Sequence, residues 1–394
     1  MKKTILAASV AGSFLVPVCT WAEAQRTFNL MNFGAACDGS HDDTVAIQAW
    51  LNKLKPSVQL VAPAGVCLFS TPLTALFAND YDISGAGPYT TTFRYVGPST
   101  ATDLLTIGDT GHGLEAGVSI HDFRITSVTK MTGGYALHAH GLFHALVSNV
   151  VLDESGNGSL CGGYWFDGAS GVDLVNPNAH SNQSCGDGVL VNAALGGVAE
   201  LRIAGGDIGG GFKSGLHMAG GFGGLRCDGT NFHRNTYNLL VDNAVVQTPN
   251  REFHQGSTCA FDSAFVSGVL VNDAQSNGGG TIDLAGWEAS AQTGAGIDIR
   301  SFRGGDIAIR GSKVFNNCQD GVYIEDPTVR VFLANTAGIN GNGNSGLAGC
   351  HVASGRGWGV NAASPTSHVV NCSVPWNNAA GALSPNVITS GQCM

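Results

Sequence analysis

Gly188-Val-Leu-Val191 is one of eight four-residue phrases in which a glycine or asparagine precedes an apolar residue, any residue and a second apolar residue. Successive phrases are 23 to 30 residues apart. A repeat of this length without a helical pattern is typical of a solenoid, in which each unit buries its apolar edge against the next. The other phrases begin at Gly134, Gly163, Gly215, Asn238, Gly268, Gly296 and Gly321, and the pattern fades at Gly346-Leu347.

A second phrase precedes the first in most repeats and alternates apolar and polar residues. This alternation predicts a strand with one face buried. Asparagine and glycine cluster between the two phrases, where tight turns need residues that tolerate positive φ. The chain lacks the Leu-x-x-Leu-x-Leu frame of leucine-rich repeats, so stacked strands are favoured and the fold class is all-β, a parallel β-helix. The alternating phrases are Val172-Asp-Leu174, Leu201-Arg-Ile203, Leu225-Arg-Cys227, Ile282-Asp-Leu284, Ile307-Ala-Ile309 and Val331-Phe-Leu333.

The N-terminal part, residues 25–60, is expected to cap the solenoid. Ser40-x-x-Asp43 fits a capping box at the start of a helix. The apolar residues Ile47, Trp50, Leu51 and Leu54 then follow at helical spacing. We therefore expect a short helix whose apolar face covers the open first coil, which would otherwise expose strand edges.

The same region resembles the opening of the pectate-lyase-like superfamily, which includes rhamnogalacturonase-like and epimerase-like proteins, relatives of glycoside hydrolase family 28 and phage tailspikes. The motif is Phe33-Gly-Ala35, Asp38-Gly39, Asp42-Asp-Thr44 and Ala46-Ile-Gln48, followed by Val61-Ala-Pro-Ala-Gly65. The resemblance implies a single-stranded right-handed parallel β-helix over 25–394 that acts on a polysaccharide. It leaves the reaction open, because members include hydrolases, lyases, epimerases and non-catalytic binders. As residues at the helix start, Asp42 and Asp43 are interpreted as structural.

The first 24 residues are predicted to be a secretory signal peptide, with Lys2 and Lys3 before the apolar stretch 5–18 and a small-x-small site at Ala22-Glu-Ala24. The mature chain is then secreted or periplasmic, with no membrane association. It carries 28 acidic and 17 basic residues, a net charge of −11. Nucleic acid is therefore excluded as a partner, since no basic excess is present to neutralise phosphates.

Ten cysteines remain after removal of the signal peptide, and this even number predicts disulfides in an exported protein. Cys161 and Cys185, and likewise Cys227 and Cys259, are about one repeat apart, which suits bonds between adjacent coils. No Cys-x-x-Cys or Cys/His cluster predicts zinc, and no cofactor is expected. Calcium becomes a candidate only if the chain is a lyase.

The best-known catalytic sets of the superfamily do not carry over to this sequence. Gly111-His-Gly113 matches one polygalacturonase motif, but it lies upstream of the coils and the other three motifs are missing. Stacked aspartates typical of pectate-lyase calcium sites are not evident either. A candidate site therefore has to come from the register of the coils.

Aligning the phrases places several charged and aromatic residues on outward-facing positions of the central coils. Asp173, Arg202, Arg226 and Asp283 share one file, and Trp165, His217, Asp298 and Tyr323 share another. Two carboxyls on neighbouring coils would lie within the 5–10 Å or so that a glycosidase requires. The predicted catalytic residues are Asp207, Asp228, Asp283 and Glu288, and the predicted substrate-binding residues are Trp165, Arg202, His217, Arg226, His233, Trp287 and Arg300.

The structural alternative to a functional role for these residues is a surface ladder of ion pairs, in which Arg202 and Arg226 pair with Asp173 and Asp228. The leading functional hypothesis is an enzyme that cleaves glycosidic bonds, with hydrolysis favoured by the outward carboxylates. One alternative is a lyase that acts by β-elimination on a uronate polymer, with a base beside a group that neutralises the uronate. The other is a non-catalytic, glycan-binding or adhesive β-helix. A monomer and a tailspike-like homotrimer both remain open.

Overall fold

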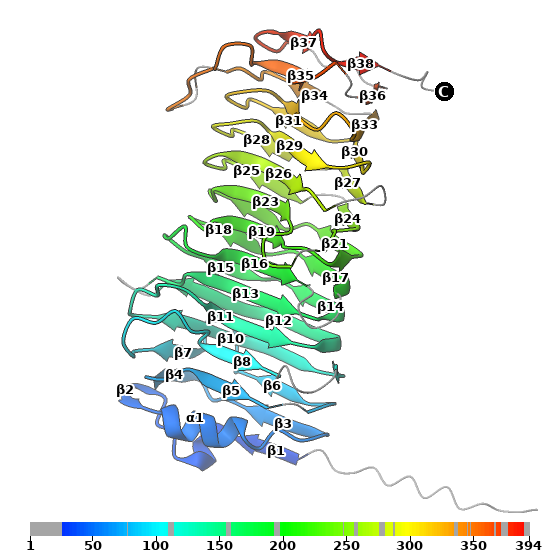
Figure 1. The fold of residues 1–394 in the computed structure, drawn as a ribbon. Coiled ribbons are helices and arrows are strands. Elements are labelled where there is room, and N and C mark those ends of the chain that lie inside the picture. Colours follow the sequence, from blue (N-terminus) through cyan, green and yellow to red (C-terminus); the bar gives the residue numbers. More distant parts are fainter. Residues whose placement is uncertain are drawn as a thin grey trace, which may run out of the picture.

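The computed structural model describes residues 26–394 apart from 77, 109–113, 155–158, 193–197, 247, 256–258, 276–279, 287, 335–337, 345, 347, 366–367, 372–376 and 390–394. The chain winds into a right-handed parallel β-helix that rises coil by coil from the N-terminal helix to the C-terminal strands (Figure 1). The predicted fold class is thus confirmed. The predicted signal peptide and the Gly111-His-Gly113 motif lie outside the described residues.

The glycine-led phrases lie in one continuous parallel sheet of 12 strands. Neighbouring strands pair in register, so residues at equivalent positions of successive phrases lie side by side. Its strands are β5 (Leu73–Ala75), β8 (Leu105–Ile107), β11 (Tyr135–His140), β13 (Gly162–Asp167), β16 (Asp187–Asn192), β19 (Ser214–Met218), β23 (Tyr237–Asp242), β26 (Ser267–Asp273), β29 (Ile297–Phe302), β32 (Val322–Ile324), β35 (Trp358–Ala362) and β37 (Gly381–Leu383).

The alternating phrases belong to a second sheet of 26 strands, which also pair in parallel. Two long strands, β10 (Ser119–Ser127) and β12 (Leu142–Glu154), bend around a corner. Beyond β12 the sheet continues as two rows. The "long row" is β14 (Ser170–Val175), β17 (Val198–Ala204), β21 (Leu225–Asp228), β24 (Glu252–Gln255), β27 (Thr281–Ala285), β30 (Asp306–Arg310), β33 (Arg330–Ala334), β36 (His368–Asn371) and β38 (Ile388–Thr389).

The "short row" consists of three-residue strands next to the long row. It contains β15 (Asn178–His180), β18 (Asp207–Gly209), β22 (Asn231–His233), β25 (Ala260–Asp262), β28 (Glu288–Ser290), β31 (Lys313–Phe315) and β34 (Gly338–Asn340). The remaining strands of this sheet are β1 (Arg26–Asn29), β2 (Asp38–Asp42), β3 (Val58–Val61), β4 (Gly65–Phe69), β6 (Asp82–Ser84), β7 (Thr91–Tyr95), β9 (Glu115–Ala116) and β20 (Phe222–Gly223).

The interior between these sheets is a column of stacked apolar side chains. Inward residues of the glycine phrases, such as Phe166 and Val191, are fully buried, as are Leu201 and Ile203 of the alternating phrases. Burying a side chain of this size contributes roughly 1.5–3 kcal/mol. At one corner an asparagine ladder runs up the coils, because Asn317 donates to Asn342 at 2.9 Å and Asn342 donates to Asn378 at 2.8 Å.

The helix α1 (Thr44–Leu51) lies at the N-terminal end of the column, as predicted (Figure 1). Its residues Ile47, Trp50 and Leu51 are buried against the first coils, and Leu54 packs just beyond the helix end. The Trp50 ring lies 6.3 Å from the Phe93 ring. The helix therefore covers the first apolar coil, with the short 3-10 helix η1 (Leu30–Phe33) beside it.

The predicted capping box at Ser40 and Asp43 is wrong. Ser40 lies in β2, where its backbone N–H and hydroxyl donate to Asp38. Asp43 occupies the N-cap position, but its carboxylate accepts the N–H of Ala36 at 2.6 Å and makes no cap bond. Asp42 instead accepts the N–H of Thr44 at 2.9 Å. Buried backbone donors thus claim Asp43, which is itself buried, and both aspartates are structural.

The last predicted phrase, Gly346-Leu347, is also misplaced. Gly346 lies in a turn, and Leu347 falls outside the described residues. The strand that follows β32 in the sheet is β35, with Gly359 and Val360 in the phrase positions. The spacing is lost because the coil contains an insertion tied down by the Cys318–Cys350 disulfide.

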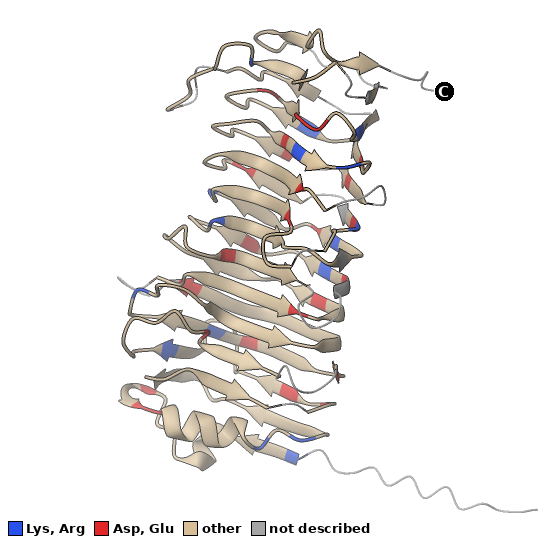
Figure 2. Ribbon diagram, viewed as in Figure 1, with Lys and Arg blue, Asp and Glu red and all other residues tan. Residues whose placement is uncertain are grey.

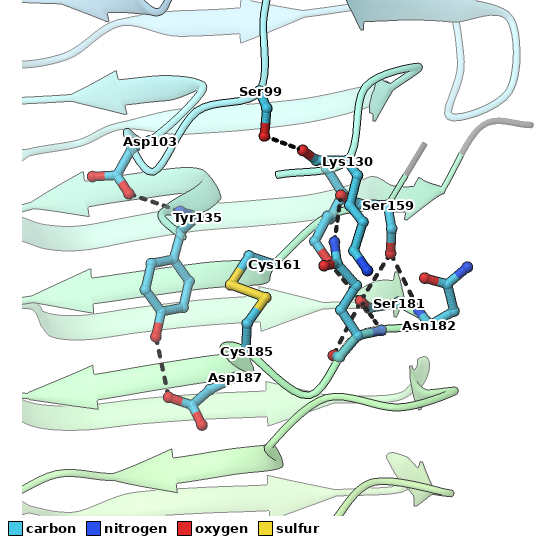
Figure 3. The surroundings of a disulfide bond; sticks show 12 residues. Ser99, Asp103, Lys130, Tyr135, Ser159, Cys161, Ser181, Asn182, Cys185 and Asp187 are labelled. Carbon is cyan, nitrogen blue, oxygen red and sulfur yellow. Dashed lines mark hydrogen bonds between the residues drawn. A yellow bond between two sulfur atoms is a disulfide. The ribbon is translucent and has the colours of Figure 1, made fainter. Parts of the chain in front are cut away.

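Four disulfides link neighbouring coils: Cys37–Cys67, Cys161–Cys185, Cys227–Cys259 and Cys318–Cys350. The two predicted pairs are among them, and Figure 3 shows the Cys161–Cys185 bond between adjacent coils. Cys372 and Cys393 lie outside the described residues. The four bonds indicate an oxidising, extracytoplasmic compartment. In the described part of the chain, no helix has the length and apolarity needed to cross a bilayer.

Candidate functional site

Charged residues occur on nearly every coil of the solenoid (Figure 2). One group stands out because its histidines and aspartates are largely buried although they point away from the apolar column. We call it the histidine face, which covers the outer side of β11, β13, β16, β19 and β23. Its members are Asp103, Tyr135, His138, His140, Trp165, Asp167, Asp187, His217 and Asp242.

The strand register explains how residues so far apart in sequence meet on this face. His138 pairs with Trp165 on the next coil, and the same file continues through Leu190 to His217. His140 pairs with Asp167 in the adjacent file. Since neighbouring strands are about 4.8 Å apart, the face spans roughly 20 Å along the solenoid.

His138 is held in one tautomer by an aspartate. Its Nδ1 lies 2.6 Å from Asp103 Oδ2, and because a carboxylate can only accept, Nδ1 carries the hydrogen. Burial lowers the pKa of His138, with a neighbouring histidine adding to the effect against the attraction of Asp103. The ring is therefore neutral near pH 7. Its Nε2 is buried, and no described residue forms a hydrogen bond with it.

Aromatic rings fix the plane of His138. The Trp165 ring stacks on it at 3.6 Å with an interplanar angle of 10°, and the His140 ring centroid lies 3.8 Å away. With the Asn192 amide oriented to satisfy both neighbours, it accepts from Trp165 Nε1 at 3.1 Å and donates to Asp167 at 2.9 Å. Trp165 is half-buried and lies on the outer face, at its predicted position.

His140 and Asp167 complete a second small cluster. His140 Nδ1 lies 3.4 Å from Asp167 Oδ2, but the contact does not have hydrogen-bond geometry. The Nδ1 atom is buried, and no described residue forms a hydrogen bond with it. One ligand atom from each of His138, His140 and Asp167 falls within 4.8 Å of the others. This set can either hold a metal ion or supply an imidazole base.

Tyr135 crosses a whole coil to reach its partner. Its hydroxyl donates to Asp187 Oδ2 at 3.1 Å, two strands away, as Figure 3 shows. The ring lies over Gly162, where a Cβ would sit 2.3 Å from a ring carbon, so a side chain at that position would displace it. Burial, and then the charge of Asp187, raise the pKa of Tyr135 far above its usual value. The phenol thus stays protonated and acts as a donor.

His217 lies beneath the surface between two carboxylates. Its Nδ1 is 2.9 Å from Asp187 and its Nε2 is 2.8 Å from Asp242. Burial alone would lower the pKa of His217, but these two charges raise it to about 9. The ring is therefore an imidazolium at neutral pH with both nitrogens occupied. His217, which the sequence predicted to bind a sugar, instead holds the carboxylates of Asp187 and Asp242 in place from the buried side of the face.

Arg300 and Asp298 lie farther along the same sheet, on β29. Arg300 donates to Asp298 at 3.1 Å and is nearly half exposed, whereas burial raises the pKa of Asp298. Three strand steps separate His217 from Asp298, or roughly 14 Å. Arg300 therefore belongs to a separate part of this surface.

The predicted residues of the long row form the surface ladder. Asp228 accepts from Arg202 at 3.1 Å and from Arg226 at 3.0 Å, while Arg202 also lies 4.0 Å from Asp173. Asp283, two strands farther along, pairs with an arginine of its own, Arg310, at 3.1 Å. These contacts are the ion pairs that the ladder interpretation predicts.

Asp207 and His233 meet on the short row. His233 Nε2 lies 3.0 Å from Asp207 Oδ2, and His180 Nε2 lies 2.8 Å from the same oxygen. Glu288 is three strands away from Asp207, roughly 14 Å, and contacts Ser290 at 2.7 Å. Trp287 lies outside the described residues.

The four predicted catalytic carboxylates are thus distributed over two rows. Asp228 and Asp283 lie on the long row, two strand steps apart and offset along the strand. The backbones of Asp228 and Asp283 are therefore more than about 10 Å apart, and those of Asp207 and Glu288 about 14 Å apart, so each carboxyl lies on a separate coil and not beside the other member of its row. Glycosidases place their two carboxyls about 5–9.5 Å apart.

The sequence did not predict the residues of the histidine face that contain the neutral imidazole and the protonated phenol. Asp103, His138 and His140 were not selected, and neither were Tyr135 and Asp187. The available signal was Tyr135-x-x-His138-x-His140, which places two imidazoles two residues apart on one outward-facing strand.

Comparison with known proteins supports the fold. No protein-family model matches the chain, and no curated protein sequence matches it. Among solved structures, the A-module of the mannuronan C-5 epimerase AlgE4 from Azotobacter vinelandii superposes with a TM-score of 0.52 and 13% identity over 92% of this chain and 100% of that one. This likeness shows the right-handed β-helix fold.

Two other solved structures show weaker similarity. The enzymatically active domain of tailspike protein 2 from bacteriophage CBA120 has a TM-score of 0.49 and 16% identity over 92% of this chain and 52% of that one. The surface adhesin PfbA of Streptococcus pneumoniae has a TM-score of 0.45 and 11% identity over 78% and 96%.

Proposed function

We propose that this right-handed β-helix is a secreted or periplasmic enzyme that acts on a polysaccharide, and that its chemistry begins with proton removal by His138. The observation that carries the proposal is the buried, unprotonated Nε2 of an imidazole whose other nitrogen is bound by Asp103. An aspartate-oriented neutral histidine is an effective general base near neutral pH.

The reaction class that best suits this base is β-elimination on a uronate polymer. The base removes the proton from the carbon that carries the carboxyl group, and the glycosidic oxygen then leaves. Tyr135 is the proton donor that we assign to that oxygen, because burial and the charge of Asp187 keep its phenol protonated. To protonate the leaving oxygen, the hydroxyl hydrogen has to turn away from Asp187, to which it is donated in the structure. Epimerisation of a uronate begins with the same proton removal and differs in what happens next.

The remaining residues of the face provide positioning and charge. Lys213 is exposed beside the histidine face, just before β19, and its positive charge helps to lower the pKa of Asp187 and of Asp242. Its ammonium group is available to a substrate carboxylate. Trp165 and Tyr135 have ring centroids 5.4 Å apart and contribute aromatic surface for a sugar ring. The His217 imidazolium offsets the negative charge of the two aspartates it bonds.

Hydrolysis, the leading expectation from the sequence, finds less support. An inverting or retaining glycosidase needs a carboxylic acid beside a second carboxyl at defined spacing. On the histidine face Asp187 and Asp242 both bond to the His217 imidazolium. Burial alone would raise the pKa of each carboxyl, but the imidazolium outweighs it, so both pKa values are lowered. They are thus ionised and poorly suited to donate a proton.

The test is a panel of acidic and neutral polysaccharides incubated with the purified full chain. An increase in ultraviolet absorbance from an unsaturated uronate, lost in His138→Gln, supports elimination. New reducing ends without that absorbance would point to hydrolysis. Binding without any product would identify a glycan-binding protein. Retention of activity in a chelator keeps His138 as the base. Loss of activity that is restored by added metal in the unmodified chain but not in His140→Ala would make the His138, His140 and Asp167 group a metal site.

A further inference from the structure

Outside the histidine face, the short row carries a second cluster of metal-ligating side chains. From its geometry we infer that His180, Asp207 and His233 bind one divalent transition-metal ion of the zinc type. This inference is independent of the proposed function, because the cluster lies on a different sheet. The three residues come from β15, β18 and β22, which are consecutive strands of that row.

The donors converge on one point. His180 and His233 occupy equivalent register positions two strands apart, so their backbones are separated by roughly 9.6 Å. Their Nε2 atoms nevertheless lie 2.8 Å and 3.0 Å from the same oxygen, Oδ2 of Asp207. The two imidazoles therefore lean toward each other across the intervening strand.

Gly209 makes this convergence possible. It occupies the register position between the two histidines, and a Cβ there would lie 2.7 Å from His233 Nε2. Any side chain at this position would push the His233 ring out of its place. A glycine at this point leaves the space above the strand to the two imidazoles.

The donor set suits zinc and related ions. Histidine nitrogen and aspartate oxygen bind zinc at about 2.0–2.2 Å, which in a tetrahedron places the donors about 3.3 Å apart. The observed distances of 2.8 Å and 3.0 Å need to open by only a few tenths of an ångström. All three side chains are partly exposed, so a fourth position can face solvent.

A neighbouring amide orients the carboxylate. Asn231 Nδ2 donates to Asp207 Oδ1 at 2.8 Å, which leaves Oδ2 directed at the histidines. Hydrogen bonds of this kind around metal ligands typically strengthen metal affinity 10–100-fold. The cluster thus has three donors and a supporting residue, whereas the surface pair of His41 and Asp38 has two ligands only.

Two other groups in the described part of the chain have similar donor spacing. Cys37, Asp43 and Cys67 form one, but its sulfurs are joined in a disulfide and are not thiolates. His138, His140 and Asp167 form the other, on the histidine face. An experiment therefore has to separate the short row from the histidine face.

Untagged full-length protein, freed of metal with a chelator, is titrated with Zn²⁺ by calorimetry and with Co²⁺ by visible absorption. We expect one site that is lost, or weakened at least 100-fold, in His180→Ala, His233→Ala and Asp207→Asn. Asn231→Ala should weaken binding about 10-fold. His41→Ala and His140→Ala serve as controls and should bind like the unmodified chain.

Each contrary result overturns the inference. No saturable binding would show that the three residues are only a hydrogen-bonded network. Binding that persists in all three ligand variants, or that disappears in His140→Ala, would place the ion elsewhere. Melting curves in chelator, which should agree between the variants and the unmodified chain, exclude unfolding as the cause of lost binding.

Discussion

Two outer faces of the same β-helix carry charge, and they differ in what their polar atoms bond to. On the ladder of the long row, Arg202 and Arg226 are at least half exposed and both bond Asp228. On the histidine face, His138 is almost fully buried, and no described residue bonds its Nε2. The ladder satisfies its charges in contact with solvent, whereas the histidine face keeps one imidazole nitrogen, His138 Nε2, to which no described residue bonds.

The difference has an energetic meaning. Exposed ion pairs contribute about 0–1 kcal/mol to stability, so a ladder can be gained or lost at little cost. A buried polar atom without a partner costs about 1–3 kcal/mol. His138 Nε2 is one of several such atoms in the described residues, and what favours a functional role for it is its place in a titratable ring that Asp103 and Trp165 hold in position.

The largest expected effect comes from removing the base. His138→Gln keeps a donor for Asp103 but cannot accept a proton, and we expect activity to fall about 10²–10⁴-fold. The melting temperature should change little. Turnover on the active polysaccharide and thermal melts measure the two effects, with Arg226→Gln as the matched control on the ladder. Equal losses in both variants would erase the distinction between the faces.

The next effect is on stability and concerns His217. Its pKa is raised from 6.5 to about 9 in the folded chain, so its stabilising contribution is complete below pH 6.5 and is lost as the pH rises through 9. The shift corresponds to about 3 kcal/mol. Thermal melts between pH 6 and 10 should show this loss, and His217→Asn should remove it. An unchanged pH profile in the variant would contradict the buried imidazolium.

A smaller effect is expected at Tyr135. Tyr135→Phe removes the donor but keeps the ring over Gly162, and we expect the turnover number to fall about 10–100-fold with little change in KM. Steady-state kinetics of the variant measure both parameters. A change confined to KM would make Tyr135 a substrate-binding residue and not a proton donor.

The smallest effect is expected on the ladder. Asp228→Asn removes a partner of two exposed arginines, and we expect less than about 1 kcal/mol of stability loss. Activity should stay within about twofold of the unmodified chain. Urea unfolding and turnover provide the measurements. If activity falls far more than stability, the substrate binds on the long row, as the sequence alone suggested.

The fold was predictable because every coil repeats one local pattern. A glycine followed by alternating apolar residues specifies which side chains enter the column, and this pattern places Phe166 or Val191 without knowledge of the neighbours. The capping box failed for a different reason. Asp43 has the right spacing for a cap, but the backbone N–H groups of Ala36 and Cys37, in the segment just before β2, bond its carboxylate instead.

The site was predictable only in part. Coil register placed Trp165 and His217 in one outward file, since equivalent positions of parallel strands lie side by side. It could not show that His217 is buried between Asp187 and Asp242, because those contacts depend on how side chains lean between coils. The reach of Tyr135 across Gly162 likewise depends on a missing side chain in a neighbouring coil.

The four disulfides have a mechanical consequence. A solenoid is held together by contacts between adjacent coils, so it can fray from either end one coil at a time. Each of these bonds closes a loop of 24 to 32 residues and stabilises it by roughly 3–4 kcal/mol. Because they recur from the first coils to the last, progressive unwinding meets a covalent barrier in each part of the protein. In a reducing environment those barriers vanish, and the ends become the entry points for proteases.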